Sequence, residues 1–193
     1  DEALYRLEND HLWPHVRQIA CRPQQIPDVG DWVEYSNLGQ SVLIVRTADG
    51  VKAYHNACRH RGVPIAGGYG NDCGKVASGN CSQSGFVCPF HGWRWNMDGE
   101  NTLVYGKHLF SERQLNPDDI NLVPCRVETW ANCAWINHDD DAPSVRETFG
   151  PVADRLDAHG IGDLKMEWWY GTVLPANWKV AMEAFMEGYH VLQ

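Results

Sequence analysis

The sequence predicts an α+β fold in which a small antiparallel β domain is flanked by helical segments. Short runs of β-prone residues separated by turn signals fill the middle of the chain. Near both ends, apolar residues recur at helical spacing instead. The length of 193 residues exceeds the common single-domain size of roughly 100–150 residues, so we expect one full domain plus part of another.

The chain is expected to open with a short amphipathic helix. Within residues 3–17, Leu4, Leu7 and Leu12 stand at near-helical spacing. Pro14 has no backbone N–H to donate, so it limits how far this helix extends.

The β domain is expected to begin at about Asp31. Asp49-Gly50 and Asp98-Gly99 are two-residue turn signals of the kind that joins antiparallel strands. The runs with strand character cover residues 31–36, 41–47, 51–57, 85–90, 92–97, 125–130 and 133–138. Together these features predict a small antiparallel β domain.

Helical periodicity returns after the polar break at residues 139–141. It predicts a helix over residues 144–160 that stops at Gly160. A strand-like segment follows at residues 165–174, and a final helix is expected over residues 178–193. We expect this final helix to be buried along the side formed by Trp178, Ala181, Met182, Phe185 and Tyr189.

The composition excludes several classes of partner. The net charge is −9, from 25 acidic and 16 basic residues, and such a balance repels nucleic acid and anionic membrane surfaces. No run approaches the ~20 consecutive apolar residues of a membrane-spanning helix, and the first residues are unlike a signal peptide. We therefore expect a cytoplasmic protein with no nucleic-acid or membrane partner.

Cysteine and histidine carry the most specific signal in the sequence. The seven cysteines are odd in number, which disfavours a disulfide framework and favours reduced thiols, some of them metal ligands. Cys58-Arg-His60 and Cys88-Pro-Phe-His91 form two Cys/His pairs, separated by residues 61–87. Thiolates and imidazoles bind zinc or iron–sulfur clusters, so the two pairs predict a metal centre held between two loops.

Two kinds of metal centre suit this ligand set. A structural zinc ion accepts two cysteines and two histidines. Each pair here is mixed, however, which favours a Rieske [2Fe–2S] cluster in which one iron takes both cysteines and the other both histidines. Gly62 and Gly92 are expected to supply tight turns beside the cluster. Trp93 and Trp95 are expected to cover it, to pack in the β core, or both.

The motifs CRHRG at residues 58–62 and CPFHGWRWNMDG at residues 88–99 resemble the Rieske domain of the Rieske non-haem iron oxygenases. The resemblance extends from ALYRLENDHLW near the start of the chain to NWKVAMEAFMEGYH near its end. It implies an antiparallel β Rieske (ISP-like) domain with an N-terminal helix and the start of an α+β catalytic domain. The implied divisions are an N-terminal helical segment (1–36) packing with the catalytic domain, the Rieske domain (37–150) and the incomplete start of the catalytic domain (151–193).

Residues 67–85 make the loop between the two Cys/His pairs longer than is usual in that family. We expect an inserted flexible excursion in which Cys73 and Cys81 are unpaired surface or packing cysteines. A mutual disulfide or a further metal site are the alternatives. The histidines outside the family motifs, His55 and His138 among them, are expected to be structural or solvated.

The resemblance also implies a second metal, a mononuclear Fe(II) held by two histidines and a carboxylate. His190 corresponds to the first iron-binding histidine, and the other ligands are expected beyond Gln193. Helical spacing places Glu183, Glu187 and His190 on a shared face. Glu187 stands where the family usually has Asp, an acid that links an iron ligand to a cluster histidine across a subunit boundary.

The implied function is that of a terminal oxygenase component. Electrons arrive from a reductase or ferredoxin that depends on NAD(P)H, pass through the cluster to the mononuclear iron, and support hydroxylation of a small organic substrate by O2. The family resemblance further implies a homotrimer or an α3β3 assembly. The alternatives are a Rieske ferredoxin that only carries electrons and a structural zinc module. An aromatic substrate is the family's commonest, although Glu at the position of Glu187 also occurs in members that oxidise quaternary amines.

Overall fold

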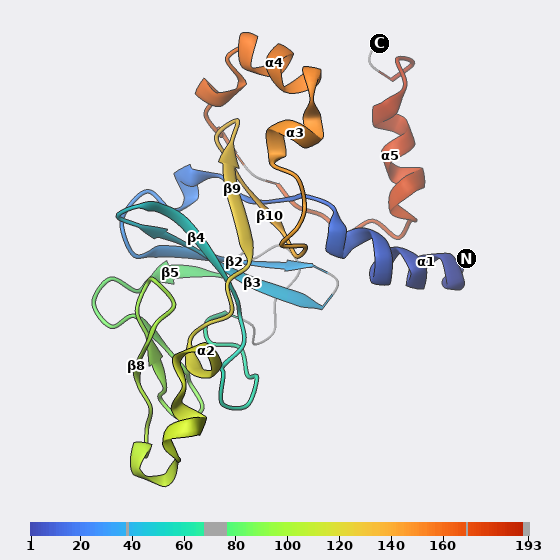
Figure 1. Ribbon diagram of the computed structural model, residues 1–193. Helices are drawn as coiled ribbons and strands as arrows, with labels where there is room; N and C mark the ends of the chain where they lie inside the picture. Colours follow the sequence, from blue (N-terminus) through green and yellow to red (C-terminus); the bar gives the residue numbers. More distant parts are fainter. Residues whose placement is uncertain (38, 68–76, 169, 191–193) are drawn as a thin grey trace.

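The computed structural model describes residues 1–37, 39–67, 77–168 and 170–190, and in this part of the chain the strands form three antiparallel sheets (Figure 1). Their strand orders are β4-β3-β2-β5, β1-β10-β9 and β6-β7-β8. The strands are β1 (Gln18–Cys21), β2 (Asp31–Asn37), β3 (Gln40–Thr47), β4 (Gly50–His55), β5 (Ser78–Asn80), β6 (Phe86–Val87), β7 (Arg94–Trp95), β8 (Asn101–Leu103), β9 (Arg126–Trp130) and β10 (Cys133–Asn137). The antiparallel β domain expected from the sequence is confirmed.

β3 is one of the two central strands of the four-stranded sheet. Residues 42–45 of this strand are fully buried in succession, as expected for a strand that is covered on both faces. The hairpin between β3 and β4 forms as predicted, with Thr47 paired to Gly50. The turn residues are therefore Ala48 and Asp49, one residue earlier than the Asp-Gly signal indicates.

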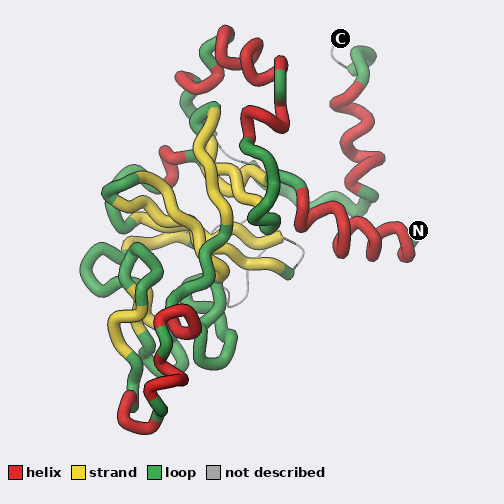
Figure 2. Tube along the Cα trace, viewed as in Figure 1, coloured by secondary structure: helices red, strands yellow, loops and turns green. Residues whose placement is uncertain are grey.

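Two buried clusters connect the sheets. One cluster joins the β6-β7-β8 sheet to the four-stranded sheet and contains Cys58, Cys88 and Trp95. The other cluster joins the four-stranded sheet to the β1-β10-β9 sheet and contains Ile44 of β3 and Ile136 of β10. Figure 2 shows the strands gathered in the middle of the molecule and the helices towards its periphery.

The N-terminal helix forms as expected. α1 (Glu2–Leu7) begins at Asp1, whose side chain accepts a hydrogen bond from the Ala3 N–H. A π-helical turn (Glu8–Leu12) and a 3₁₀ turn (Trp13–His15) continue it. The next α-helix along the chain is the short α2 (Pro117–Ile120).

The single helix predicted over residues 144–160 is wrong, because two helices occupy this stretch. α3 (Val145–Phe149) ends at Gly150, and α4 (Pro151–Ala158) begins directly after it. Gly150 has a φ of +51°, outside the helical region, and Pro151 has no N–H for a continuing helical hydrogen bond. The strand predicted over residues 165–174 is also wrong, since none of the described residues there belongs to a strand.

The final helix, α5 (Trp178–Met186), begins where the sequence predicts and ends earlier. The Asn177 side chain caps it by accepting a hydrogen bond from the Lys179 N–H. Helical backbone stops at Met186, and Glu187 is extended, with φ −127° and ψ 157°.

The expectation that one side of α5 is buried is wrong for the described chain. Phe185 is 80% exposed and Tyr189 is 73% exposed. α5 contacts the N-terminal helical segment instead: the ring centroids of Trp178 and Trp13 are 5.4 Å apart, and Lys179 forms an ion pair with Glu8. Figure 1 shows α5 next to this N-terminal segment, running in a different direction from α1.

The described part of the expected excursion between the two Cys/His pairs belongs to the fold. β5 lies within it and pairs with β2. Cys81 is a packing cysteine, because it is buried and its thiol donates to the Gly30 carbonyl at 3.3 Å. Cys73 lies outside the described residues. Among the described residues, no helix is long and apolar enough to cross a membrane.

Candidate metal centre

The loop that carries Cys58 and His60 is closed by its own backbone. The Cys58 N–H donates to the Val63 carbonyl at 2.8 Å, and the Gly62 N–H donates back to the Cys58 carbonyl at 2.7 Å. Gly62 has a φ of +70°, in the left-handed region that glycine adopts without steric cost. The loop thus presents its Cys and His side chains from a tight, hydrogen-bonded turn.

The loop that carries Cys88 and His91 repeats this scheme. The Cys88 N–H donates to the Trp93 carbonyl at 2.8 Å, and the Gly92 N–H donates to the Cys88 carbonyl at 2.9 Å. Gly92 has a φ of +69°. The tight turns expected at both glycines are therefore present, and the two loops form a matched pair.

The two cysteine side chains meet in the interior. Cys58 is 4% exposed and Cys88 is 2% exposed. Burial raises the pKa of the Cys58 thiol, and the neighbouring Cys88 thiol raises it further. A cationic metal centre would reverse this preference, because binding to a metal deprotonates a thiol.

The two histidines meet at the edge of the same site. His60 Nδ1 and His91 Nδ1 are 3.2 Å apart, and the ring centroids are 4.9 Å apart. Burial lowers the pKa of His60, and His91 and the Arg61 charge lower it further, so the neutral, metal-binding form of His60 is favoured.

This donor set fits a metal centre. Imidazole nitrogens about 2.0–2.1 Å from one tetrahedral metal ion stand about 3.3–3.4 Å from each other, and the 3.2 Å between His60 Nδ1 and His91 Nδ1 is close to that separation. The thiols of Cys58 and Cys88 lie together as a second pair. A paired-thiol side and a paired-imidazole side are what a Rieske cluster requires of its protein.

Aromatic rings flank the two histidines, and His91 stays exposed. Trp93 stacks on His60 with ring centroids 5.2 Å apart and an interplanar angle of 7°. Phe110 packs edge-on against Trp93, and Phe90 lies 3.9 Å from the His91 ring, measured between centroids. The expected covering role of Trp93 is consistent with this packing.

Trp95 has the packing role instead. It is fully buried, and its indole N–H donates to the Ile120 carbonyl at 2.7 Å.

Phe110 was not indicated by the sequence, because it lies far along the chain from both loops and belongs to no local motif. Arg59, beside the first loop's histidine, donates to the Asp119 carbonyl at 2.9 Å.

The C-terminal site residues lie in a different part of the molecule. Glu187 and His190 follow the end of α5, so the helical face expected to join Glu183 to them does not extend that far. The three side chains still line one shallow, open depression. His190 Nδ1 contacts a Glu187 carboxylate oxygen, and this bond, together with the Tyr189 N–H, lowers the pKa of Glu187.

The structure brings the four predicted cluster ligands together but keeps His190 apart from them. Figure 1 shows α5 and the sheet that contains β8 at opposite ends of the molecule. The two groups of predicted site residues therefore lie far apart within one chain.

Two protein-family models match this chain, one over the region of the cluster loops and one over the region of α5. The family model "Rieske [2Fe-2S] domain" matches residues 16–107, and "Ring hydroxylating alpha subunit (catalytic domain)" matches residues 127–193. The carnitine monooxygenase oxygenase subunit of Acinetobacter baumannii is 30% identical over 97% of this chain and 48% of its own length. The biphenyl 2,3-dioxygenase α subunit of Rhodococcus jostii is 30% identical over 98% of this chain and 40% of its own.

The solved structures agree with the sequence comparison. A quaternary ammonium Rieske monooxygenase in complex with L-carnitine superposes with a TM-score of 0.81 at 26% identity, over 96% of this chain and 50% of that one. The fold and the two ligand loops thus define a Rieske-type protein. The chain belongs to the Rieske non-haem iron oxygenases and corresponds to the N-terminal portion of their α subunit. It spans about half the length of the relatives it matches.

Membership in this family implies two cofactors. The Rieske domain implies a [2Fe–2S] cluster, and the ring-hydroxylating catalytic domain implies a mononuclear iron. The individual ligands and the domain limits at residues 36/37 and 150/151 remain predictions.

Proposed function

We propose that this chain belongs to a terminal oxygenase component that hydroxylates an organic substrate with O2. Cys58 and Cys88 would hold one iron of the cluster, and His60 and His91 the other. The observation that carries the proposal is the 3.2 Å separation of the two histidine Nδ1 atoms beside two buried, adjacent cysteines. His190 would be the first ligand of the mononuclear iron.

The cofactors supply the redox chemistry: the cluster stores and passes single electrons, and the mononuclear iron offers open positions to dioxygen. The protein's part is to orient the ligands and to exclude water. Trp93 stacks on His60 and shields its ring. Nδ1 of each cluster histidine faces the metal position, which leaves Nε2 as the atom that can exchange a proton with the surroundings.

Glu187 would act as the positioning residue between the two sites. Its carboxylate contacts His190 Nδ1 in this structure. A carboxylate that accepts a hydrogen bond from a ligating histidine fixes the orientation of the imidazole ring and its tautomer. With two carboxylate oxygens, Glu187 has acceptor capacity for a second histidine as well.

The separation of α5 from the cluster loops supports an assembly of several subunits. If the electron path crosses to a neighbouring chain, the cluster of one subunit serves the iron of the next, as in the homotrimer or α3β3 assembly that the family resemblance implies. The electron donor would be a separate reductase or ferredoxin.

Two substrate classes are in question. An aromatic ring is the expectation drawn from the family as a whole. Two observations favour a quaternary ammonium compound: Glu187 in place of the usual Asp, and the similarity to a carnitine monooxygenase and to a quaternary ammonium monooxygenase with bound carnitine.

The decisive experiment uses the complete protein, reconstituted with cluster, iron, a reductase and NAD(P)H under labelled dioxygen. We expect an EPR signal from the reduced cluster and label in a hydroxylated product, tested with carnitine-like and aromatic substrates in parallel. Cys88→Ser should abolish both results, and the matched control Cys133→Ser, another buried cysteine, should retain both.

The other outcomes separate the alternatives. A normal EPR signal without product from either substrate class, and without bound mononuclear iron, would favour a Rieske ferredoxin. A colourless, EPR-silent protein with bound zinc would establish the zinc module and contradict the proposal.

A further inference from the structure

A second group of metal-binding side chains lies outside the predicted cluster site. One donor atom each from His55, Cys125 and His138 lies within 4.8 Å of the other two. Cys125 belongs to the core cluster that joins the four-stranded sheet to the β1-β10-β9 sheet, whereas Cys58 and Cys88 belong to the other core cluster. The group is therefore distinct from the cluster ligands.

The backbone holds two of these residues side by side. His55 ends β4, and its N–H donates to the Val123 carbonyl at 2.9 Å. The Cys125 N–H donates to the Ala53 carbonyl at 2.9 Å, and Tyr54 forms a β-bridge with Pro124. These bonds join the end of β4 to the chain just before β9.

The hairpin of β9 and β10 brings in the third residue. Asn137 pairs with Arg126 at the last position of the ladder. Extending this antiparallel register by one residue places His138 opposite Cys125. The three ligand positions are thus set by strand pairing, which makes them less adjustable than positions on a free loop.

The distances are close to those that a bound ion imposes. Cys125 Sγ and His138 Nδ1 are 3.9 Å apart, and the rings of His55 and His138 have centroids 5.5 Å apart with a tilt of 33°. Sulfur about 2.3 Å and nitrogen about 2.0–2.1 Å from a tetrahedral zinc stand about 3.6 Å apart. A shift of a few tenths of an ångström in one side chain closes the difference.

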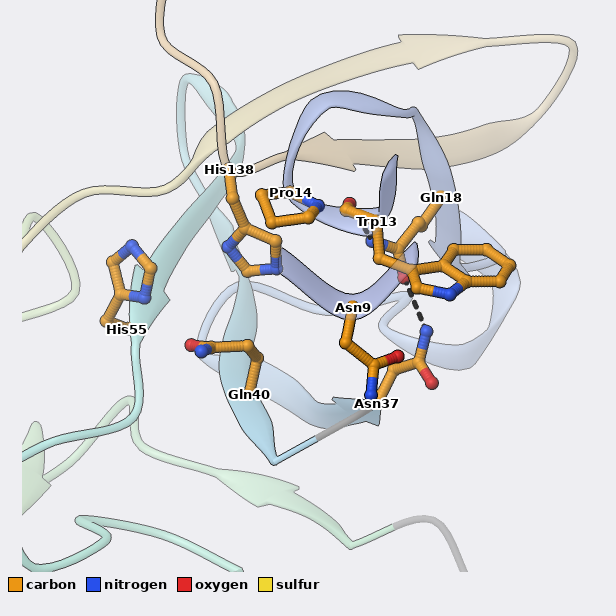
Figure 3. Close-up of a pocket in the computed structure, with 8 residues that line it drawn as sticks. All are labelled: Asn9, Trp13, Pro14, Gln18, Asn37, Gln40, His55 and His138. Carbon is orange, nitrogen blue, oxygen red and sulfur yellow. Dashed lines mark hydrogen bonds between the residues drawn. The ribbon is translucent and has the colours of Figure 1, made fainter. Parts of the chain in front are cut away.

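A pocket gives access to the two imidazoles. It has a volume of about 160 Å³, and His55 and His138 line one end of it. Figure 3 shows both rings together there, with Gln40 and Asn9 also lining the pocket. Cys125 is not among the lining residues and is 5% exposed, so the thiol forms the buried side of the site.

The electrostatics suit a cation. Burial lowers the pKa of His55 and of His138, and this favours the neutral imidazoles that bind metals. Burial raises the pKa of Cys125 to about 11, and the Asp140 charge contributes to that shift. A divalent cation would lower it and take the thiolate as ligand, with Asp140 nearby as a balancing negative charge.

We propose that His55, Cys125 and His138 bind one divalent cation of the zinc class, with the fourth coordination position open towards the pocket. Mixed imidazole and thiolate ligands select zinc or a similar borderline metal over magnesium or calcium. The ion would bridge β4, β9 and β10 where the N-terminal segment packs against them. This inference does not rest on the oxygenase function proposed above.

The test uses the cluster-loaded complete protein and zinc as the probe. Zinc is added in competition with a chelator, bound zinc is measured by elemental analysis, and its ligands are identified by X-ray absorption at the zinc edge. We expect one sulfur neighbour at about 2.3 Å. The mononuclear iron site has no cysteine ligand in the scheme above, and the cluster thiolates are occupied by iron, so this sulfur comes from neither of those sites. The Cys125 variant then tests whether it belongs to Cys125.

Matched variants make the assignment specific. Cys125→Ser should remove the sulfur neighbour, and His138→Gln should weaken zinc binding at this site at least tenfold. Cys133→Ser and His159→Gln are the controls and should change neither result. The EPR signal of the reduced cluster checks that each variant is folded.

Two results would overturn the proposal. One is a zinc shell that contains no sulfur in the unmodified protein or that keeps its sulfur in Cys125→Ser. The other is equal zinc affinity in His138→Gln and His159→Gln. Loss of oxygenase activity alone would not bear on it, and correct zinc binding in an inactive protein would leave it intact.

Discussion

The two predicted metal sites differ in how much of their structure this chain provides. Each cluster loop is closed by two backbone hydrogen bonds, and its cysteine is almost completely buried. Glu187 and His190 are exposed, follow the end of a helix and contact mainly each other. The first site is therefore shaped by the local fold, whereas in the second the described residues hold the side chains through only a few local contacts.

This contrast matches the two tasks we propose. A cluster that gains and loses electrons benefits from ligands held rigidly, because little reorganisation then accompanies the transfer. An iron site that binds substrate and dioxygen needs open positions and a pocket around them. The strand-paired cluster loops suit the first task, and the segment after α5 would supply the first ligand for the second.

The largest expected effect separates the two sites directly. His190→Ala in the complete protein should abolish product formation, since the mononuclear iron loses its first ligand. The EPR signal of the reduced cluster should stay unchanged, because α5 lies at the opposite end of the molecule from the sheet that contains β8. His159→Ala, which changes another exposed histidine, should leave both readouts intact. Loss of the cluster signal in His190→Ala would show that the two sites were assigned wrongly.

Removing the proposed link between the sites should have a smaller effect. Glu187→Ala should leave both metals bound but slow single-turnover oxidation of the cluster by roughly 10–100-fold, the range seen when a partner of a metal ligand is removed. Glu187→Gln should be milder, because its amide oxygen still accepts a hydrogen bond from His190. Unchanged single-turnover kinetics in Glu187→Ala would rule out the bridging role.

The sequence predicted most of what is local in this structure. The hairpin of β3 and β4 follows from two runs of β-prone residues and the turn signal between them. The pairing of Cys and His in both loops follows from their spacing. The break between α3 and α4 was also readable, since Gly150 and Pro151 are adjacent, but helical periodicity on both sides concealed it.

Features that depend on contacts distant in sequence were not predictable. β5 consists of Ser78, Gly79 and Asn80, none of them β-prone, and it pairs through its backbone with β2. A side chain at Gly79 would lie only 2.9 Å from the Trp32 ring, so close packing explains this glycine. His55 and His138 looked unremarkable because only the sheet register brings them together with Cys125.

Replacing Glu128, on strand β9, should have a moderate effect on the stability of the fold. The Glu128 carboxylate on β9 lies 2.8 Å from the buried guanidinium of Arg17 and accepts a hydrogen bond from the Val145 N–H at 2.9 Å. Burial alone would raise the pKa of Glu128, but the bonds from Val145 and Arg126 and the Arg17 charge outweigh it and lower the pKa below its ordinary 4.5. The charged form therefore stabilises the fold.

The sign of the pH dependence follows from that shift. The contribution of Glu128 is fully present above pH 4.5 and is lost as the pH falls through the lower pKa of the folded state. Glu128→Gln should reduce the free energy of unfolding by about 2 kcal/mol at pH 7, with less difference from the unmodified protein in acid. Urea unfolding at several pH values measures this. A pH-independent difference would mean that the charge of Glu128 contributes nothing.

The smallest expected effect compares glycines in the two regions. Gly92 has a φ of +69°, so Gly92→Ala should cost roughly 1–2 kcal/mol of stability even though open space surrounds the position. Gly188 also lies in open space but shows no such backbone conformation, and Gly188→Ala should cost no more than about 0.5 kcal/mol. Thermal unfolding of both variants, followed through the cluster's visible absorption, tests this difference. If the two substitutions cost the same, the cluster loop is no more constrained than the segment after α5, and the contrast between the two sites does not come from their backbones.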